Sequence, residues 1–255
     1  MITSRQNERI KYIRSLARRR VRQREGRFVL EGTRLVEELV RAGVAPALVL
    51  YTPAWAASPA GQRLLPDLAG AEEGCWAASE AVLAAASSTE TPQGVLVLAP
   101  FVHCPPRPGL ILILDQVRDP GNLGTIIRSA EAAGAGQVIL APGTVDAYNP
   151  KVVRGAMGAH FRLAVSSLEW PAIARRIEGR QVWLADARGA AAYDRVDWTQ
   201  PSALIVGGEA AGAGEQAANL ATGRVAIPMA PGPESLNAAM AATVILFEAA
   251  RQQRG

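Results

Sequence analysis

The chain has 255 residues, of which 49% are hydrophobic and 20% are charged, and this balance excludes a disordered, collagen-like or coiled-coil protein. At about 100–200 residues per domain, the length accommodates one large domain or two smaller ones. The sequence has no run of about 18 uncharged apolar residues, and its first nine residues lack the apolar centre of a signal peptide, so we expect a cytoplasmic protein with no membrane partner.

Positive charge is concentrated at the start of the chain. The formal net charge is +4, but residues 1–30 contain ten basic and two acidic residues, which leaves a net charge of −4 on the other 225. Apolar residues recur at near-helical spacing over residues 7–23, which predicts an amphipathic helix with a basic exterior. Arginine binds phosphate in a bidentate manner and stacks on bases, so this helix is a candidate RNA-binding surface, although a merely solvated helix face is the simpler alternative. The candidate RNA-binding residues are Arg14, Arg18, Arg19, Arg20 and Arg22.

The rest of the first hundred residues alternates between strand and helix. Alanine is so frequent between residues 55 and 86 that the periodicity there is weak. Outside that stretch, strands are predicted at residues 28–30, 47–51 and 95–98, and helices at residues 33–42 and 79–86.

A proline-rich segment interrupts this alternation. Residues 100–108 contain four prolines, which cannot continue a helix or a central strand. We therefore expect a first domain at residues 1–100, a linker at residues 101–108 and a second domain at residues 109–255.

The second domain is predicted to be an α/β fold with a mainly parallel sheet. Residues 110–114 form a continuous apolar run of the kind that is buried on both faces of such a sheet. The last helix is apolar on nearly all sides, so it must be covered by its own sheet and by something else, which indicates a subunit interface. Further strands are predicted at residues 138–140, 182–185, 203–206 and 225–227, and helices at 123–133, 149–157, 169–178, 215–221 and 235–252.

No metal site or disulfide framework is expected. The chain has only two cysteines, Cys75 and Cys104, which are not spaced as a CxxC pair. Its only histidines are His103 and His160, which are too few to complete a tetrahedral zinc site.

The loops after the strands are the candidate functional sites, because ligands bind outside the carboxyl ends of the strands in open α/β sheets. The first such loop begins at Asp115 and leads into a helix that contains Asn122, Gly124 and Arg128. Asn122 could simply cap this helix, and Arg128 could be a solvated helical arginine. However, the side chain of Arg128 leans back over Gly124, which leaves room for a phosphate or a developing oxyanion beside the helix start.

Two further loops carry polar residues among glycines and prolines. Residues 206–214 contain Glu209 among four glycines, and their spacing matches neither a P-loop nor a dinucleotide-binding motif. A tight turn is the simpler interpretation, but a backbone can approach a ligand closely there. Residues 227–237 contain three prolines, which stiffen the loop before Ser235 and Asn237, and either of these could cap the next helix.

In this order and spacing, the three loops resemble the motifs of the SpoU (TrmH-like) family of RNA ribose 2′-O-methyltransferases, within the SPOUT superfamily. The resemblance covers residues 108–255, while residues 1–100 resemble the ribosomal-protein-like substrate-binding domain that is often joined to it. The sequence departs slightly from the family pattern, since Ala238-Ala-Met-Ala replaces the more usual Val-Ser-Val-Ala. The matching segments are Asn122-x-Gly124-x-x-x-Arg128, Val206-Gly-Gly-Glu209, and Ile227-Pro-Met with Glu234-Ser-Leu-Asn237.

The resemblance implies a parallel-sheet domain with a deep trefoil knot that binds S-adenosylmethionine in a bent shape. It also implies a homodimer through the C-terminal domain, with the active site near the subunit contact. The residues that it places around the transferred methyl group are Arg128, Glu209, Ser235 and Asn237, and it assigns Asn122 to orienting these neighbours. Those that it assigns to cofactor binding are Gly207, Gly208, Ile227, Met229, Ser235 and Leu236.

The implied reaction is attack of an RNA ribose 2′-hydroxyl on the methyl group of S-adenosylmethionine. Ribosomal RNA, 23S above all, is the expected substrate, with transfer RNA second. Arg128 is often cast as the base in this family, but a guanidinium with a pKa above about 12 resists deprotonation, so we favour an anchoring role. The alternatives are a catalytically inactive RNA-binding or ribosome-assembly homologue and a nicotinamide or flavin enzyme, which would need a glycine fingerprint that is missing here.

Overall fold

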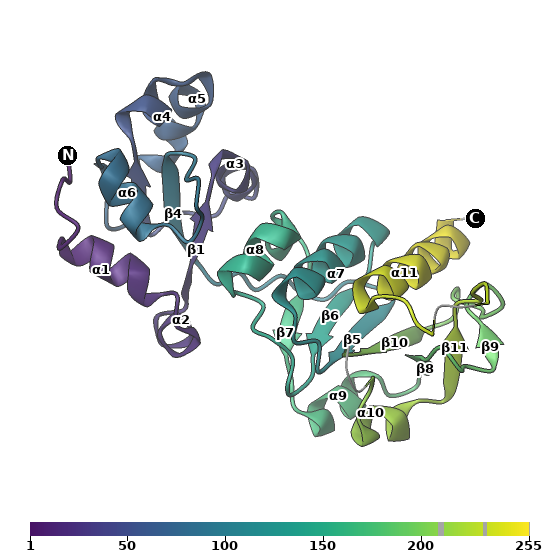
Figure 1. Ribbon diagram of the computed structural model, residues 1–255. Coiled ribbons are helices and arrows are strands. Elements are labelled where there is room, and N and C mark those ends of the chain that lie inside the picture. Colours follow the sequence, from purple (N-terminus) through teal and green to yellow (C-terminus); the bar gives the residue numbers. More distant parts are fainter. Residues whose placement is uncertain (209–211, 232–233, 255) are drawn as a thin grey trace. The chain divides into compact units, whose positions relative to one another are not determined.

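The computed structural model describes residues 1–208, 212–231 and 234–254, and the chain forms two compact units. Unit 1 comprises residues 1–102 and 148–161, and unit 2 comprises residues 103–147 together with residues 162 to the C-terminus (Figure 1). The chain therefore leaves unit 1 after Val102 and later returns to it for one short segment.

Unit 1 is a small α/β domain built on a four-stranded sheet. Its strands are β1 (Arg27–Glu31), β2 (Leu48–Tyr51), β3 (Cys75–Ala77) and β4 (Val95–Pro100). Their order is β1-β4-β2-β3, where β4 runs antiparallel to both β1 and β2 and β3 runs parallel to β2. The strand β3 therefore lies at an edge of this sheet.

Helices cover both faces of the unit 1 sheet, because its strands alternate apolar side chains between two hydrophobic clusters. Leu48 and Leu96 point into one cluster with helices α1 and α6, and Val49 and Val97 point into the other with α3 and α5. The helices of this unit are α1 (Glu8–Ser15), α2 (Arg19–Glu25), α3 (Thr33–Arg41), α4 (Pro53–Ala57), α5 (Pro59–Leu68), α6 (Glu80–Ala86), α8 (Pro150–Ala156) and the short 3-10 helix η1 (Ala159–Phe161).

The returning segment completes the second of these clusters. The ring of Tyr148 stacks on Phe101 with ring centroids 3.9 Å apart and lies 4.8 Å from the ring of Phe28. Val153 on α8 and Phe161 on η1 are buried in the same cluster. Residues 148–161 are thus part of the hydrophobic core of unit 1.

Unit 2 contains a seven-stranded sheet in which every strand pair is parallel, as the alternating pattern of the sequence predicts. The strand order is β7-β6-β5-β10-β8-β11-β9. All five residues of β5 are buried, in agreement with its continuous apolar sequence. The strands are β5 (Ile111–Asp115), β6 (Gln137–Leu140), β7 (Val165–Ser167), β8 (Gln181–Ala185), β9 (Ala191–Ala192), β10 (Ser202–Gly207) and β11 (Gly223–Ala226).

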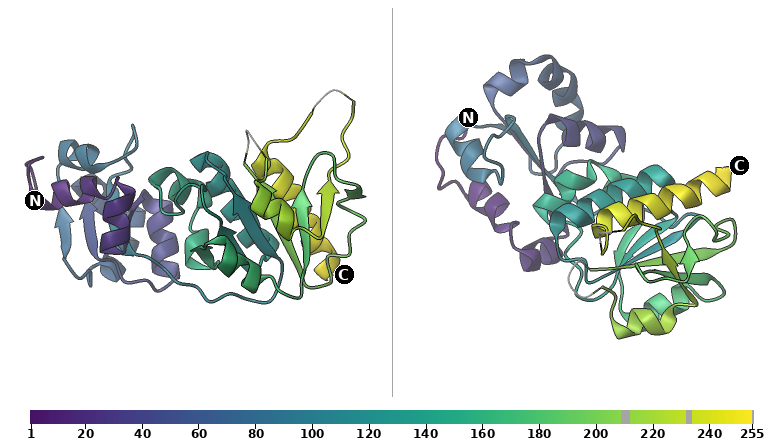
Figure 2. Two further views of the ribbon diagram at one scale, coloured as in Figure 1. Left: turned by 90° about the horizontal axis from the view of Figure 1, so that it is seen from below. Right: turned by 45° about the vertical axis from the view of Figure 1, so that its right-hand side comes forward.

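Two pairs of helices sandwich this sheet. The helices α7 (Pro120–Ala133) and α11 (Ala238–Arg254) lie side by side on one face (Figures 1 and 2). The helices α9 (Trp170–Arg176) and α10 (Glu215–Leu220) cover the other face, where Trp170, Ile173 and Ala217 pack against apolar strand residues. The loops between strands and helices are thereby held on a rigid scaffold.

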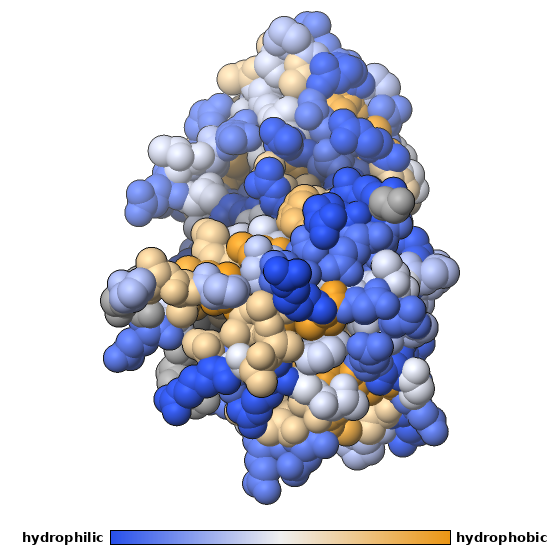
Figure 3. All heavy atoms as spheres, turned by 90° about the vertical axis from the view of Figure 1, so that its right-hand side faces the viewer, coloured by the Kyte–Doolittle hydropathy of each residue, from blue (hydrophilic) through white to orange (hydrophobic). Residues whose placement is uncertain are grey.

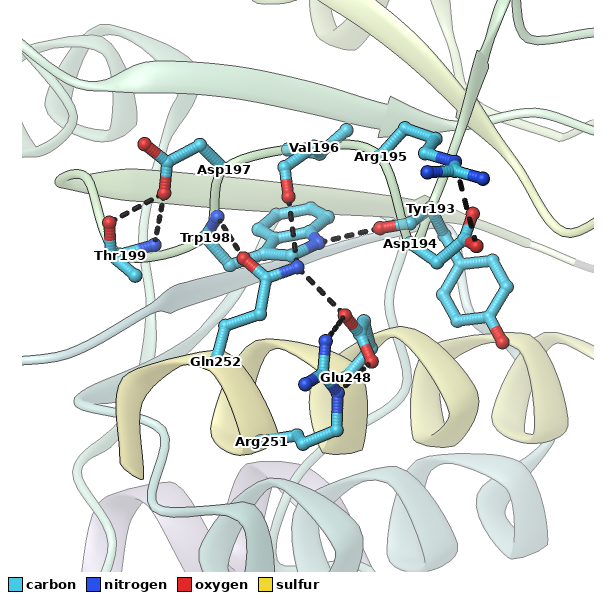
Figure 4. A network of polar contacts seen from close by, with 10 residues as sticks. All are labelled: Tyr193, Asp194, Arg195, Val196, Asp197, Trp198, Thr199, Glu248, Arg251 and Gln252. Carbon is cyan, nitrogen blue, oxygen red and sulfur yellow. Dashed lines mark hydrogen bonds and ion pairs between the residues drawn. The ribbon is translucent and has the colours of Figure 1, made fainter. Parts of the chain in front are cut away.

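The loop after β9 fastens the C-terminal half of α11 (Figure 4). The fully buried indole of Trp198 donates its Nε1–H to the Tyr193 carbonyl at 2.8 Å, and the backbone N–H of Trp198 donates to Gln252 Oε1 at 2.9 Å. Hydrogen bonds from Arg251 and then Gln252 lower the pKa of Glu248 to about 2. The carboxylate of Glu248 is therefore charged in the folded protein across the neutral range.

The structure differs from the sequence-based expectations in a few elements. The helix predicted at residues 7–23 is two helices, because the guanidinium of Arg22 donates hydrogen bonds to the carbonyls of Leu16 and Ala17 where α1 ends. The helices α4 and α5 were not predicted, although Thr52 and Ser58 cap them and a proline follows each cap. The strands β3, β7 and β9 were not predicted either, because each has only two or three residues, too few to show the alternation of a strand.

Candidate active site

The three matching segments are called the first, second and third motif in chain order. The first motif, with Asn122, contacts the third, with Asn237, through these two asparagines. Asp119, rather than Asn122, caps α7, since its carboxylate accepts a hydrogen bond from the backbone N–H of Asn122 at 2.8 Å. The side chain of Asn122 instead accepts a hydrogen bond through Oδ1 from Nδ2 of Asn237 at 3.0 Å. Residues 115 positions apart in the sequence are thus joined directly.

The third motif forms the start of α11. Asn237 Oδ1 accepts hydrogen bonds from the backbone N–H groups of Ala239 at 2.8 Å and Met240 at 3.3 Å, so the side chain caps this helix. The same side chain therefore begins α11 with its oxygen and binds Asn122 with its nitrogen. Ser235 and Leu236, just before it, are exposed.

The second motif passes very close to the end of β5. A Cβ atom on Gly208 would lie 2.2 Å from the carbonyl oxygen of Gln116, and one on Gly207 would lie 2.3 Å from the backbone nitrogen of Ala213. A side chain at either position would force the neighbouring backbone to move. Gly208 and Gly212 also exchange two backbone hydrogen bonds of 3.1 Å each. Glu209 lies outside the described residues.

Asp115 ties this loop down from the neighbouring strand. Its side chain is 1% exposed, and Oδ2 accepts a hydrogen bond from the backbone N–H of Gly214 at 2.6 Å. Because Gly214 precedes α10, the carboxylate fixes the far end of the second motif. The sequence analysis assigned Asp115 no role, although a carboxylate directly after a fully apolar strand is a signal that could have identified it.

One cavity of about 530 Å³ collects the backbone and side chains of the second and third motifs. Asn122, Asn237 and Arg128 do not line it, but Leu236 and Ala238 line it on either side of Asn237, so the asparagine contact lies next to its wall. All six residues that the resemblance assigns to cofactor binding line this cavity: Gly207, Gly208, Ile227, Met229, Ser235 and Leu236.

Three charged residues complete the lining: Asp186 and Arg188 just after β8, and Arg224 on β11. Asp186 accepts a hydrogen bond from the backbone N–H of Arg188 at 2.9 Å and forms an ion pair with the guanidinium of Arg224, and these contacts lower the pKa of the Asp186 carboxyl. The cavity therefore presents a charged carboxylate near neutral pH. These three residues were not predicted, because neither the loop after β8 nor β11 carries a recognisable motif.

Arg128 is exposed on α7, six residues after Asn122. Within the part of the chain that the structure describes, its guanidinium is found in no ion pair. The described residues thus bring Asn122 and Asn237 together and leave Arg128 facing solvent.

The comparison with known families decides what these motifs represent. Residues 109–247 match the SpoU rRNA Methylase family, and residues 7–97 match the MRM3-like substrate binding domain. The chain belongs to the SpoU rRNA methylase family. This SpoU methylase is 32% identical to the 23S rRNA (guanosine(2553)-2′-O)-methyltransferase RlmP of Bacillus subtilis, over 96% of this chain and 97% of that protein. It is 31% identical to the human mitochondrial rRNA methyltransferase 3, over 92% of this chain and 70% of that protein.

Solved structures show the same architecture. The AdoMet-bound rRNA methyltransferase from Sinorhizobium meliloti is 31% identical and superposes with a TM-score of 0.87, covering 98% of this chain and 97% of that one. The SpoU methyltransferase AviRb from Streptomyces viridochromogenes, in complex with the cofactor AdoMet, is 32% identical with a TM-score of 0.85, covering 97% of this chain and 99% of that one.

The basic N-terminal segment of this SpoU methylase is largely, but not wholly, exposed. Arg14, Arg18, Arg19 and Arg20 lie at the surface of unit 1. Arg22 differs from these neighbours, because it is 2% exposed and its guanidinium donates hydrogen bonds to two carbonyls at the end of α1.

Two other features are not found among the described residues. No group of three His, Cys, Asp or Glu side chains among them comes together as a metal ion would require. None of the described helices is both long enough and apolar enough to span a membrane.

Proposed function

We propose that this SpoU methylase transfers a methyl group from S-adenosylmethionine to a ribose 2′-hydroxyl of 23S ribosomal RNA, in the cytoplasm where that substrate resides. The observation that carries the proposal is the cavity of about 530 Å³ that unites the second and third motifs beside the Asn122–Asn237 contact. Relatives of similar length are named 23S rRNA 2′-O-methyltransferases, which supports the choice of substrate.

The cavity suits S-adenosylmethionine in size and chemistry. Ligand pockets commonly measure about 300–1,000 Å³ and are mainly apolar with a few polar groups. Here Leu184, Ile227 and Ile245 offer apolar walls for an adenine ring, while Gly207 and Gly208 line the cavity with backbone alone. Asp186 adds a carboxylate for a hydroxyl or cationic group of the ligand. When bound, the cofactor supplies an electrophilic methyl group on a sulfonium.

Arg128 is proposed to anchor the RNA rather than to remove the proton. Its guanidinium keeps its proton at neutral pH and is well shaped for bidentate contact with the phosphate beside the target ribose. In that position it also stabilises negative charge on the attacking oxygen. Glu209 is proposed to hold this guanidinium, and Asn122, Ser235 and Asn237 to supply the polar groups around the transferred methyl.

The enzyme is proposed to work as a homodimer through unit 2. The side of α11 that faces away from its own sheet exposes Met240, Val244 and Phe247, which recur at helical spacing and form one apolar stripe. Apolar residues also reach the surface among hydrophilic ones on the side of the molecule shown in Figure 3. A second copy of unit 2 would cover this stripe by twofold symmetry. Sedimentation of the Val244→Glu variant should show monomers where the wild type shows dimers.

We propose the trefoil knot in unit 2 because the chain belongs to the SpoU family. Gly208 and Gln116 directly follow the paired residues Gly207 and Asp115 of the neighbouring strands β10 and β5, so their close approach continues the parallel strand pairing. True knots are rare among folds, and no local contact reveals one.

Methyl transfer to RNA from cells that lack the gene tests the proposal directly. We expect label from S-adenosylmethionine in ribosomal RNA at one ribose, and calorimetry should show saturable binding of S-adenosylmethionine but not of a nicotinamide dinucleotide. Label confined to transfer RNA would reassign the substrate. Cofactor binding without transfer to either RNA would identify an inactive homologue. Full turnover by Arg128→Lys would refute the anchoring role, because lysine lacks the bidentate geometry.

A further inference from the structure

One tryptophan of unit 1 is exposed on an edge strand. Trp76 lies in the middle of β3 and is 36% exposed, whereas Trp55, Trp170 and Trp198 are buried. Its register partner is Leu50 on β2, which points to the sheet face that α1 covers. A single exposed apolar residue is ordinary in a folded protein, so exposure alone does not indicate a site. The surroundings of this ring provide the further evidence.

The indole ring of Trp76 is held in one orientation. Its Nε1–H donates to the carbonyl of Glu73 at 2.9 Å, so the polar group of the ring is satisfied within the protein. The chain turns at Gly74 with a φ of +89°, and a Cβ atom there would lie 3.0 Å from Nε1 and 3.3 Å from the adjacent ring carbon. Glycine therefore permits the ring to fold back over the turn. Because the indole N–H is used within the protein, a ligand can contact only the carbon atoms of this fixed ring.

A guanidinium lies on this ring. The Cζ atom of Arg9, on α1, is 4.1 Å from the centroid of the Trp76 ring. A cation over an aromatic face is attracted by the ring quadrupole, which keeps the guanidinium in place. Within the described residues Arg9 is found in no ion pair, so its charge is not neutralised by a carboxylate.

Two acidic side chains near Trp76 share one guanidinium. Glu72 and Glu73, just before Trp76, both pair with Arg27. The hydrogen bond with Glu73 is the largest cause that raises the pKa of Arg27, so this guanidinium stays charged at neutral pH. Because two carboxylates share one guanidinium, the cluster carries a formal charge of −1, and Arg9 rather than this cluster supplies the attraction for a polyanion beside Trp76.

We propose that Trp76 and Arg9 form a stacking site for one unpaired base of the RNA substrate. Unpaired bases in RNA stack on aromatic rings and on guanidinium planes, and the stack of Arg9 on Trp76 presents both in a fixed arrangement. The base extends this stack, and the positive charge of Arg9 attracts the adjoining phosphate. The site selects unpaired over paired RNA, because a base within a duplex has no face to offer. This inference rests on the proposed RNA substrate and adds the point at which unit 1 recognises single-stranded structure.

Binding of short RNA probes to the full-length protein tests the site. The probes are a fluorescein-labelled unpaired oligonucleotide of about twelve nucleotides and the same oligonucleotide annealed to its full complement as a blunt duplex. Trp76→Leu should weaken binding of the unpaired probe about 5- to 150-fold, which is the usual effect of losing one base stack, and should change binding of the duplex less than about twofold. Trp76→Phe retains a ring and should stay within about threefold of the wild type.

The arginine is tested against a control of equal charge. Arg9→Ala should weaken binding of the unpaired probe more than Arg63→Ala does, since Arg63 is an exposed arginine of the same unit that pairs with Glu37 instead of an aromatic ring. Equal effects of the two substitutions would show that Arg9 contributes only a general positive charge, and this result would overturn the stacking site.

Photochemical cross-linking of the wild-type protein avoids any dependence on how the variants fold. A 5-iodouridine in the unpaired probe reacts with the aromatic ring on which it stacks, so we expect the cross-link in the peptide that contains Trp76. Cross-links only elsewhere, or an equal loss of paired and unpaired binding in Trp76→Leu, would overturn the inference while leaving the proposed function intact. A wild-type protein that binds neither probe contradicts the proposed function itself.

Discussion

The Gly208→Ala substitution probes the close approach of two backbone segments, at Gly208 and Gln116, beside the cavity. An added Cβ would lie 2.2 Å from the carbonyl oxygen of Gln116 and 2.8 Å from its carbonyl carbon, whereas ordinary contacts begin at 3.4 Å. Both are backbone atoms, so neither can yield as a flexible side chain would. One of the two chain segments must therefore shift by roughly 1 Å, and packing an extra methyl group into such a site costs about 1–3 kcal/mol of stability.

The shift should weaken ligand binding in the cavity that we propose for the cofactor. Gly208 lines the cavity together with Gly207 and Gly212, so a displaced backbone moves part of its wall. A misplacement of about 1 Å in an enzyme site can lower the rate by about 100-fold. We expect S-adenosylmethionine to bind at least about 10-fold more weakly and methyl transfer to fall about 100-fold, in a protein that remains folded at room temperature.

Titration calorimetry and thermal unfolding measure the two effects separately. The matched control is Gly70→Ala, because an added Cβ at Gly70 meets nothing within 4 Å. The control should bind the cofactor and unfold like the wild type. If Gly208→Ala did the same, the backbones at Gly208 and Gln116 would not lie at contact distance, and this part of the cavity wall would not depend on a glycine.

Three further predictions concern the asparagine contact, the basic segment and the anchored end of α11. Asn237→Ser keeps a helix cap but is too short to reach Asn122, so turnover should fall by up to about tenfold, the equivalent of about 1.4 kcal/mol, with little change in melting temperature. Unchanged turnover would remove this contact from the site. Replacing Arg18, Arg19 and Arg20 by alanine should make the slope of log affinity for RNA against log salt concentration shallower by about 2. Arg22→Ala should instead lower the melting temperature and leave that slope unchanged. Equal slopes for the triple variant and the wild type would assign residues 18–20 to a solvated helix face. Glu248→Gln should have a lower free energy of unfolding than the wild type near neutral pH. This difference should shrink as the pH falls from about 4.5 through 2, because the pKa of Glu248 is about 2 in the folded protein and the carboxyl of the unfolded chain is protonated first. A difference that grows toward low pH would contradict the assigned hydrogen bonds.

The parallel sheet of unit 2 was predictable because its central strands are continuous apolar segments. Residues 110–114 are the clearest example, and the observed strand Ile111–Asp115 is buried throughout. The order of the strands could not be predicted in the same way, because β10 lies between β5 and β8 although many residues separate these strands in the chain. No local period reveals that order. The convergence of the second and third motifs on one cavity therefore came from the family resemblance and not from pattern.

The residues that the sequence analysis missed or misassigned share a physical reason. Asp115 and Asp186 act through backbone partners that only the folded chain brings near, namely the N–H groups of Gly214 and Arg188. Arg22 looked like its exposed arginine neighbours, but it turns inward because two carbonyls at the end of α1 need donors. Charge and spacing identify which residues can bind a ligand, while partners supplied by the fold decide which of them do.

The return of residues 148–161 to unit 1 has a practical consequence for dissecting the protein. A fragment that stops at residue 102 would lack Val153 and Phe161 from its interior and would leave Phe28 and Phe101 without the aromatic neighbour at position 148. The complementary fragment would carry that stretch as an apolar insert with nothing to pack on. RNA recognition and methyl transfer in this protein are therefore to be separated by point substitutions in the intact polypeptide, because deletion would damage both halves at once.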